Sequence, residues 1–223
     1  MPQRSYSTSR RPSISRVLLV AACATCLELG ATGLYAATSL DFATKSTGAA
    51  LGGFDLSQGH WATVSDATAA AGLAIEQSGA PTAGEGFPLA IYESVPLKNA
   101  QISLRLNAVG GKSDQGGGVA MRLSSLQDYY LIQVDAMRDR VLFSRVSNGA
   151  SEEIVGVDAD IASHSWHTLT VRAEDDEFVV SLDGSWVFTA FDKTLSQAGR
   201  IALWTKGDSV TAFTEFTYAS TSR

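Results

Sequence analysis

The chain has 223 residues, of which 45% are hydrophobic, and it carries 17 basic and 23 acidic side chains for a formal net charge of −6. This length is sufficient to bury a hydrophobic core. The negative charge argues against binding to nucleic acid or to an anionic membrane surface.

The first 36 residues have the order of a secretory signal peptide. Residues 1–16 carry four arginines and no acid, residues 17–27 are apolar, and small residues follow. We therefore expect export to the periplasm or the outside of a bacterial cell, with cleavage between about Thr32 and Thr38. Removal of residues 1–36 leaves 13 basic and 22 acidic side chains, a net charge of −9.

Three alternatives remain open for this leader. The run 17–36 is long enough for a membrane helix, but Glu28 within it costs a few kcal/mol. The sequence ending at Cys23 resembles a bacterial lipobox, and Ser9-Arg10-Arg11 resembles the start of a twin-arginine signal. Both cysteines, Cys23 and Cys26, lie in the leader, so the exported domain would hold its fold without disulfides.

Residues 37–223 indicate a single domain of short strands separated by turns. Strands are predicted at residues 40–42, 61–64, 73–77, 89–92, 101–109, 119–123, 129–136, 141–146, 166–173, 178–182, 186–190, 201–205 and 210–218. Asp183-Gly184 is a strong hairpin signal because glycine accepts a positive φ. More than ten strands and no substantial helix predict an all-β, two-sheet antiparallel jelly-roll sandwich.

Alternation within these strands predicts which side chains share a face. In the strand 119–123, Met121 and Leu123 are expected on one face and Arg122 on the other. In the segment that begins at Trp166, that residue is expected in the core and His167 near the surface.

Several stretches resemble the concanavalin A-like lectin/glucanase superfamily. They are S-W-H-T-L-T-V-R from Ser165, E-F-V-V-S-L-D-G-S-W-V-F from Glu177 and G-R-I-A-L-W-T-K from Gly199. F-P-L-A-I-Y at 87–92, G-K-S-D-Q-G-G-G at 111–118 and D-Y-Y-L-I-Q-V-D-A-M at 128–137 resemble secreted bacterial proteins of the family 16 glycoside hydrolase-like, or 3-keto-disaccharide hydrolase, group. The resemblance covers about residues 40–218.

This resemblance implies a jelly-roll domain and, as one alternative, lyase, hydratase or hydrolase activity on 3-keto-glycosides. Two departures affect the implied ligand: Gln133 and Asp135 stand where relatives often have Arg and Asn, and Phe213-Thr214-Glu215 replaces a frequent Asp-Asp. A lyase would need a base, for which His167, Asp135 and Asp208 are the candidates.

Glucanase chemistry on this fold requires the strand motif E-x-D-x-x-E, which the chain lacks. The nearest matches, Glu174-x-Asp176 and Asp158-x-Asp160, fall in a turn and a loop. His164 and His167 alone make a poor metal site. The sequence therefore predicts no cofactor, no metal and no hydrolysis of β-glucans.

A set of polar and aromatic residues on otherwise apolar strands suggests a ligand groove. Burying an unpaired cation is costly, so these groups either pair or face water. Sugars need such donors, acceptors and flat rings. The groove candidates are Arg122, Tyr130, Gln133, Arg145, Trp204, Lys206 and Asp208. The alternative is a salt-bridge network of Lys206 and Asp208 with Arg122.

Three functions follow as hypotheses. The first is a non-catalytic, exported carbohydrate-binding module that acts as a monomer on a saccharide or glycoconjugate. The second is a structural or partner-binding domain of the cell envelope. The third is the lyase, hydratase or hydrolase on oxidised sugars that the resemblance implies.

Overall fold

The computed structural model describes residues 33–34, 37–40, 52–79 and 87–222, which contain sixteen strands and no helix. The chain divides into two units, residues 1–31 and 32–223, and every described residue belongs to the second. Cys23 and residues 1–32 of the expected leader lie outside the described ranges, whereas the predicted cleavage interval falls partly within them, at residues 33–34 and 37–38. Export, cleavage and the alternative acylation stay predictions. Within those ranges there is no helix of the length and apolarity that crossing a membrane requires.

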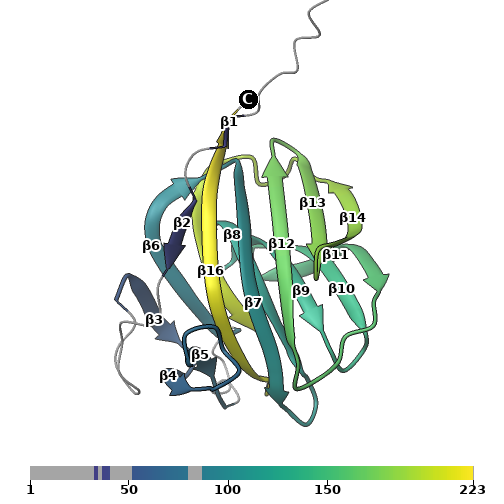
Figure 1. Ribbon diagram of the computed structural model, residues 1–223. Coiled ribbons are helices and arrows are strands. Elements are labelled where there is room, and N and C mark those ends of the chain that lie inside the picture. The colour runs from purple at the N-terminus through teal and green to yellow at the C-terminus, as the bar shows by residue number, and fades with distance from the viewer. Residues whose placement is uncertain (1–32, 35–36, 41–51, 80–86, 223) are drawn as a thin grey trace, which may run out of the picture. The chain divides into compact units, whose positions relative to one another are not determined.

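One sheet, which we call the front sheet, faces the viewer in Figure 1. Its main path runs β14-β13-β12-β7-β16-β5-β4, and β1 and β2 also pair with β16, always antiparallel. Its strands are β1 (Gly33–Leu34), β2 (Thr38–Leu40), β4 (Trp61–Ser65), β5 (Leu73–Gln77), β7 (Ala100–Gly110), β12 (Trp166–Glu174), β13 (Glu177–Leu182), β14 (Ser185–Phe191) and β16 (Val210–Ser222).

The second sheet, the back sheet, lies behind it in the same view (Figure 1). Its order is β11-β10-β9-β8-β15-β6-β3, again antiparallel. Its strands are β3 (Phe54–Gln58), β6 (Leu89–Leu97), β8 (Gly116–Ser125), β9 (Asp128–Asp135), β10 (Arg140–Ser147), β11 (Ala150–Asp158) and β15 (Gly199–Thr205).

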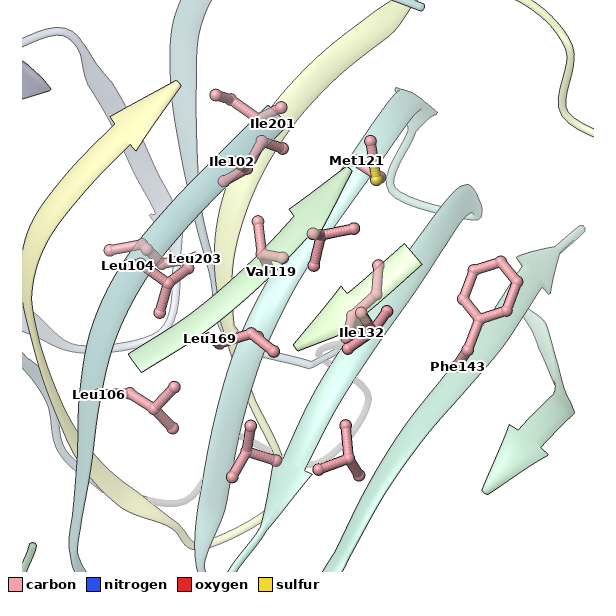
Figure 2. Packing of buried hydrophobic residues seen from close by; sticks show 14 of the residues in the cluster. Ile102, Leu104, Leu106, Val119, Met121, Ile132, Phe143, Leu169, Ile201 and Leu203 are labelled. Atoms are coloured by element: carbon pink, nitrogen blue, oxygen red, sulfur yellow. The ribbon is translucent and has the colours of Figure 1, made fainter. Parts of the chain in front are cut away.

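Alternate side chains from both sheets meet in one buried layer (Figure 2). Ile102, Leu104 and Leu106 of β7 are at most 1% exposed. Three aromatic rings, of Tyr130, Phe143 and Phe178, cluster in the same layer with centroids 4.6–5.4 Å apart. Burial of such side chains stabilises the fold by about 1.5–3 kcal/mol each.

The predicted jelly-roll sandwich is confirmed. Each predicted strand is present, although residues 41 and 42 of the first lie outside the described ranges. The sequence reasoning missed β1, β3 and β11. The missed β11 is an edge strand whose first half is exposed and rich in glutamate, so it shows no apolar periodicity.

A β-bulge overturns the predicted faces within β8. Arg122 has φ 49°, and the pairing register with β9 shifts between Met121 and Ser125. The extra residue turns Arg122 inward over the rings of Tyr130 and Phe178, whereas Leu123 joins an apolar cluster on the outer face. The prediction that Leu123 shares a face with Met121 is therefore wrong.

The predicted placement of Trp166 and His167 is also reversed. Leu169 and Val171 of β12 point inward, so His167 points inward at the edge of the core and Trp166 outward. The His167 ring lies 2.7 Å from an Asp183 carboxylate oxygen, whereas Trp166 Nε1 donates to the Thr68 hydroxyl at 2.8 Å.

Candidate functional site

The seven groove candidates lie in two separate places. Arg122, Tyr130 and Arg145 point from the back sheet toward the interior and its edge. Gln133 and Trp204 lie on the outer face of the back sheet, and Lys206 and Asp208 follow β15 at the end of that face. Ligand binding by these residues stays a prediction, but a single groove does not unite them.

Arg122 is a buried cation, 1% exposed, that joins three loops. Its guanidinium donates to the carbonyl oxygens of Lys98, Asp175 and Leu195 at 3.0, 2.6 and 3.2 Å. Burial lowers its pKa from the ordinary arginine value, although nearby acids oppose that shift. With all three of its nitrogens engaged, Arg122 acts as a structural connector and does not belong to a groove.

Tyr130 and Arg145 meet at Asp192. The Tyr130 hydroxyl donates to Asp192 Oδ1 at 2.5 Å, and Arg145 pairs with both Asp192 and Glu152. Burial, followed by the hydrogen bond to Asp192, raises the pKa of Tyr130 to about 12. Burial alone would raise the pKa of Asp192, but hydrogen bonds from Tyr130 and Thr194 and the charge of Arg145 outweigh it and lower that pKa.

Gly118 of β8, which we call the glycine floor, lies between the two candidates on the outer face. Gln133 lies opposite Gly118 of β8, and Gly118 lies opposite Trp204 of β15. The backbones of Gln133 and Trp204 are therefore about 10 Å apart, which is two strand spacings. A Cβ at Gly118 would lie 2.0 Å from the Ile132 carbonyl oxygen, so only glycine lets β8 approach β9 this closely.

Next to this floor lies a group of five polar side chains, which we call the polar cluster: Asp114, Gln133, Asp135, Arg138 and Lys206. Arg138 Nη1 lies 3.0 Å from Asp114 and 2.8 Å from the buried Asp135. Lys206 Nζ lies 3.1 Å from Asp114 and 3.9 Å from Asp135. Two half-exposed cations thus share two carboxylates, and Gln133 donates to Asp135 at 3.4 Å.

Asp208 holds the loop that carries Asp114 of this cluster. Its carboxylate accepts hydrogen bonds from the backbone N–H groups of Lys112, Ser113 and Asp114 at 2.9, 3.1 and 2.9 Å. These bonds, that of Lys112 first, lower the pKa of Asp208. The predicted pairing of Lys206 with Asp208 is replaced by Lys206 with Asp114.

Sequence reasoning missed Asp114 and Arg138. Asp114 lies in the loop between β7 and β8 and Arg138 in the turn between β9 and β10, where a charged residue is ordinarily only solvated. The signal that could have found them is spacing: Asp135 closes β9, and Arg138, three residues later in the hairpin, reaches back to it. Asp114 precedes the glycine run that opens β8.

Two aromatic rings flank the other side of the glycine floor. The rings of Phe87 and Trp204 have centroids 5.2 Å apart; Phe87 is 41% exposed and Trp204 is 1% exposed. Within the described residues Trp204 Nε1 has no hydrogen-bond partner of regular geometry. Burial raises the pKa of Tyr129, and its interaction with the neighbouring Trp204 indole N–H partly opposes this rise.

A shallow depression of about 560 Å³ adjoins the polar cluster at Arg138. Its lining also includes Asp139, Asp158, Ala159 and Asp160. Asp158 closes β11 and Asp160 lies in the loop after it, so these acids do not share the face of one strand. In the described part of the chain, no three His, Cys, Asp or Glu side chains gather to hold a metal ion.

The three candidate bases are all engaged. The two ring nitrogens of His167 contact Asp183 and the Ala162 carbonyl oxygen at 2.7 and 3.0 Å. Asp135 is surrounded by the donors of the polar cluster, and Asp208 holds the backbone of residues 112–114.

Comparison with known proteins identifies the fold of this chain but does not assign it to a family. No protein-family model and no curated protein matches the chain. The carbohydrate-binding module CBM66 from Bacillus subtilis is 24% identical at a TM-score of 0.63, over 75% of this chain and 96% of that one. A putative glycosyl hydrolase from Parabacteroides distasonis is 13% identical at 0.51, over 72% and 89%.

Domain 4 of AbnA, a GH43 extracellular arabinanase from Geobacillus stearothermophilus solved with arabinotriose, is 11% identical at 0.50, over 73% and 76%. Identities this low carry the fold alone, since one sandwich hosts many activities. The chain shares the jelly-roll sandwich fold of these structures, and the resemblance to the concanavalin A-like superfamily is consistent with that fold. The narrower resemblance to 3-keto-disaccharide hydrolases stays a prediction.

Proposed function

We propose that the protein is an exported, non-catalytic carbohydrate-binding module whose saccharide site is the polar cluster together with Phe87 and Trp204. The observation that carries this proposal is an indole N–H, buried beside a glycine floor on the same face as the polar cluster and without a well-aligned hydrogen-bond partner in the described chain. A buried donor without a good acceptor costs up to about 1–3 kcal/mol, which a ligand oxygen would recover.

The chemistry of this face suits a sugar. The open face of the Phe87 ring can stack on the C–H face of a pyranose. Arg138 and Lys206 present donors, and Asp114 presents an acceptor, at positions that water reaches. Solved structures with the same fold include a module that is itself described as carbohydrate-binding, which supports the proposal.

The lyase or hydratase activity that the resemblance implies finds less support. Such chemistry needs a base that is free to take a proton next to a ketone. The carboxylate of Asp208 has a lowered pKa and holds a loop, and both ring nitrogens of His167 already have partners.

The test is calorimetry with a panel of neutral oligosaccharides. A module of this kind binds at about millimolar Kd, near −4 kcal/mol, so loss of one charged hydrogen bond of roughly 1.5–3 kcal/mol weakens binding at least tenfold. We expect this loss in Lys206→Met and in Arg138→Met. Lys98→Met, which removes a half-exposed lysine paired with Asp175 instead, is the matched control.

Both cluster variants should fold, because each leaves the other cation, and Gln133, beside the buried Asp135, so that this carboxylate keeps a partner. Unchanged affinity in Lys206→Met and Arg138→Met would move the site elsewhere. A panel that the wild-type protein does not bind at all would favour the structural or partner-binding alternative.

A further inference from the structure

A second surface, on the other sheet, carries two large aromatic side chains in water. Trp186 is 66% exposed and Phe191 is 64% exposed, and both belong to the edge strand β14. Burying apolar side chains of this size stabilises a folded protein. The fold forgoes most of that gain here, and exposed apolar area of this kind marks an interaction surface.

A β-bulge places both rings on the same face. They are five positions apart in the sequence, which in a regular strand would put them on opposite faces. The β13–β14 register shifts between Val180 and Ser181, so that Trp186 lies opposite Ser181 and Phe191 opposite Glu177. Trp186 Nε1 donates to the Thr189 hydroxyl at 3.3 Å, which places Thr189 on this face between the two rings.

Strand pairing extends this face into three rows, which we call the β14 platform. The rows are Trp186-Ser181-Thr170, Thr189-Val179-Arg172 and Phe191-Glu177-Glu174. Rows two residues apart on a strand are separated by about 7 Å and neighbouring strands by about 4.8 Å. The platform is therefore about 14 Å long and about 10 Å wide, with an aromatic ring at each end of one long side.

The end near Phe191 holds a polar pocket of about 40 Å³. Its lining is Arg172, Glu174, Glu177 and Val179. The Glu174 side chain is buried, and its Oε1 accepts from Arg172 Nη2 at 2.6 Å and from Nε at 3.1 Å. Hydroxyl-sized ligand groups would therefore meet fixed acceptors and a donor directly beside an exposed ring.

We propose that the β14 platform binds a neutral polysaccharide chain, with sugar rings stacked on Trp186 and Phe191 and hydroxyl groups bonded in the pocket between Glu174, Glu177 and Arg172. A sugar has both an apolar C–H face and a dense set of hydroxyls, which this alternation of rings and polar groups matches. Within the three rows two carboxylates face one guanidinium, which disfavours uronates, sulfated glycans and phosphates. This inference adds a surface to the proposed function and uses none of the polar cluster.

The experiment is affinity electrophoresis of the purified protein in gels containing soluble mixed-linked β-glucan, xylan or galactomannan. Trp186→Ala and Phe191→Ala should each lower the apparent affinity about tenfold, which corresponds to about 1.4 kcal/mol, because each change removes both the stacking contact and the apolar area that it buries. Trp186→Phe should stay within about threefold because it keeps a ring. Leu126→Ala, which truncates an exposed apolar side chain in the β8–β9 turn, is the control and should not change retention.

Retention that is unchanged in both alanine variants overturns the platform. A dimer seen by sedimentation velocity in the wild type and lost in Trp186→Ala also overturns it, since a second copy would then cover this face. Loss of retention in Lys206→Met alone refutes the platform and leaves the proposed function standing. Loss in Trp186→Ala and Phe191→Ala alone supports the platform and refutes the polar cluster as the saccharide site.

Discussion

Replacing Arg122 by methionine tests whether this buried cation is structural. Methionine fills most of the volume of the arginine stem but removes the donors to the carbonyl oxygens of Lys98, Asp175 and Leu195. Hydrogen bonds to charged groups contribute roughly 1.5–3 kcal/mol each. These three carbonyls belong to loops that water partly reaches, so about 1 kcal/mol for each is the realistic loss.

The guanidinium also lies 5.0 Å from the ring centroid of Phe178 and 5.7 Å from that of Tyr130. Cation–π contacts of this kind add about 0.5–1 kcal/mol each. Relief of the desolvation cost of a buried charge offsets part of the total. We therefore expect Arg122→Met to lower the free energy of unfolding by roughly 3–5 kcal/mol.

The assay is urea unfolding followed by tryptophan fluorescence and by far-UV circular dichroism. Arg140→Met is the control, since this half-exposed arginine pairs with exposed Glu153 and Asp158 and should cost less than about 1 kcal/mol. Arg122→Lys keeps the charge, but a lysine cannot reach three carbonyls at once. The stability of this variant should therefore fall between those of the wild type and Arg122→Met. If Arg122→Met loses less than about 1 kcal/mol, the connector role is wrong.

Three further predictions follow from single contacts. Because the pKa of Tyr130 is raised from 10.0 to about 12, its neutral form stabilises the fold below pH 10 and this contribution is lost as pH rises toward 12; Tyr130→Phe should flatten that alkaline limb in pH-dependent urea melts. Gly118→Ala should cost roughly 1–3 kcal/mol, because the added Cβ has only 2.0 Å to a carbonyl oxygen; an unchanged urea midpoint would contradict this. The lowered pKa of Asp208 means that its hold on residues 112–114 is present above the ordinary aspartate range and lost as pH falls, so Asp208→Asn should speed amide hydrogen exchange at Lys112 and Asp114 at neutral pH.

The strands that the sequence predicts are those in which apolar and polar side chains alternate regularly. Within β7, inward Ile102 and Leu104 alternate with outward Ser103 and Arg105, and the structure follows this pattern. The pattern fails where a bulge inserts one residue, as at Arg122. Nothing in a local run of residues marks that insertion, since the positive φ of Arg122 is maintained by three carbonyls from distant loops.

The candidate site was predictable only in part, for a related reason. Gln133, Trp204 and Lys206 stood out because a polar or very large residue interrupts an apolar strand. Asp114, the partner of Lys206, comes from a loop about ninety residues earlier in the chain, and its place depends on the hydrogen bonds that its backbone and its neighbours donate to Asp208. Such pairings arise from sheet order, which strand periodicity does not specify.

Arg122 in β8 and Arg138 in the β9–β10 turn differ in role because of where they lie in the sandwich, since the residue type is the same. Arg122 finds its acceptors in backbone carbonyls, which remain fixed once the loops fold, so its hydrogen bonds are tied to the global fold. Arg138 finds its acceptors in the side chains of Asp114 and Asp135 and keeps about half of its surface in water. A ligand hydroxyl can exchange with water at Arg138 at little cost, whereas the same exchange at Arg122 would require three loops to open. Saccharide binding should therefore depend on Arg138 while stability depends on Arg122, and the two methionine variants measured side by side separate the two roles.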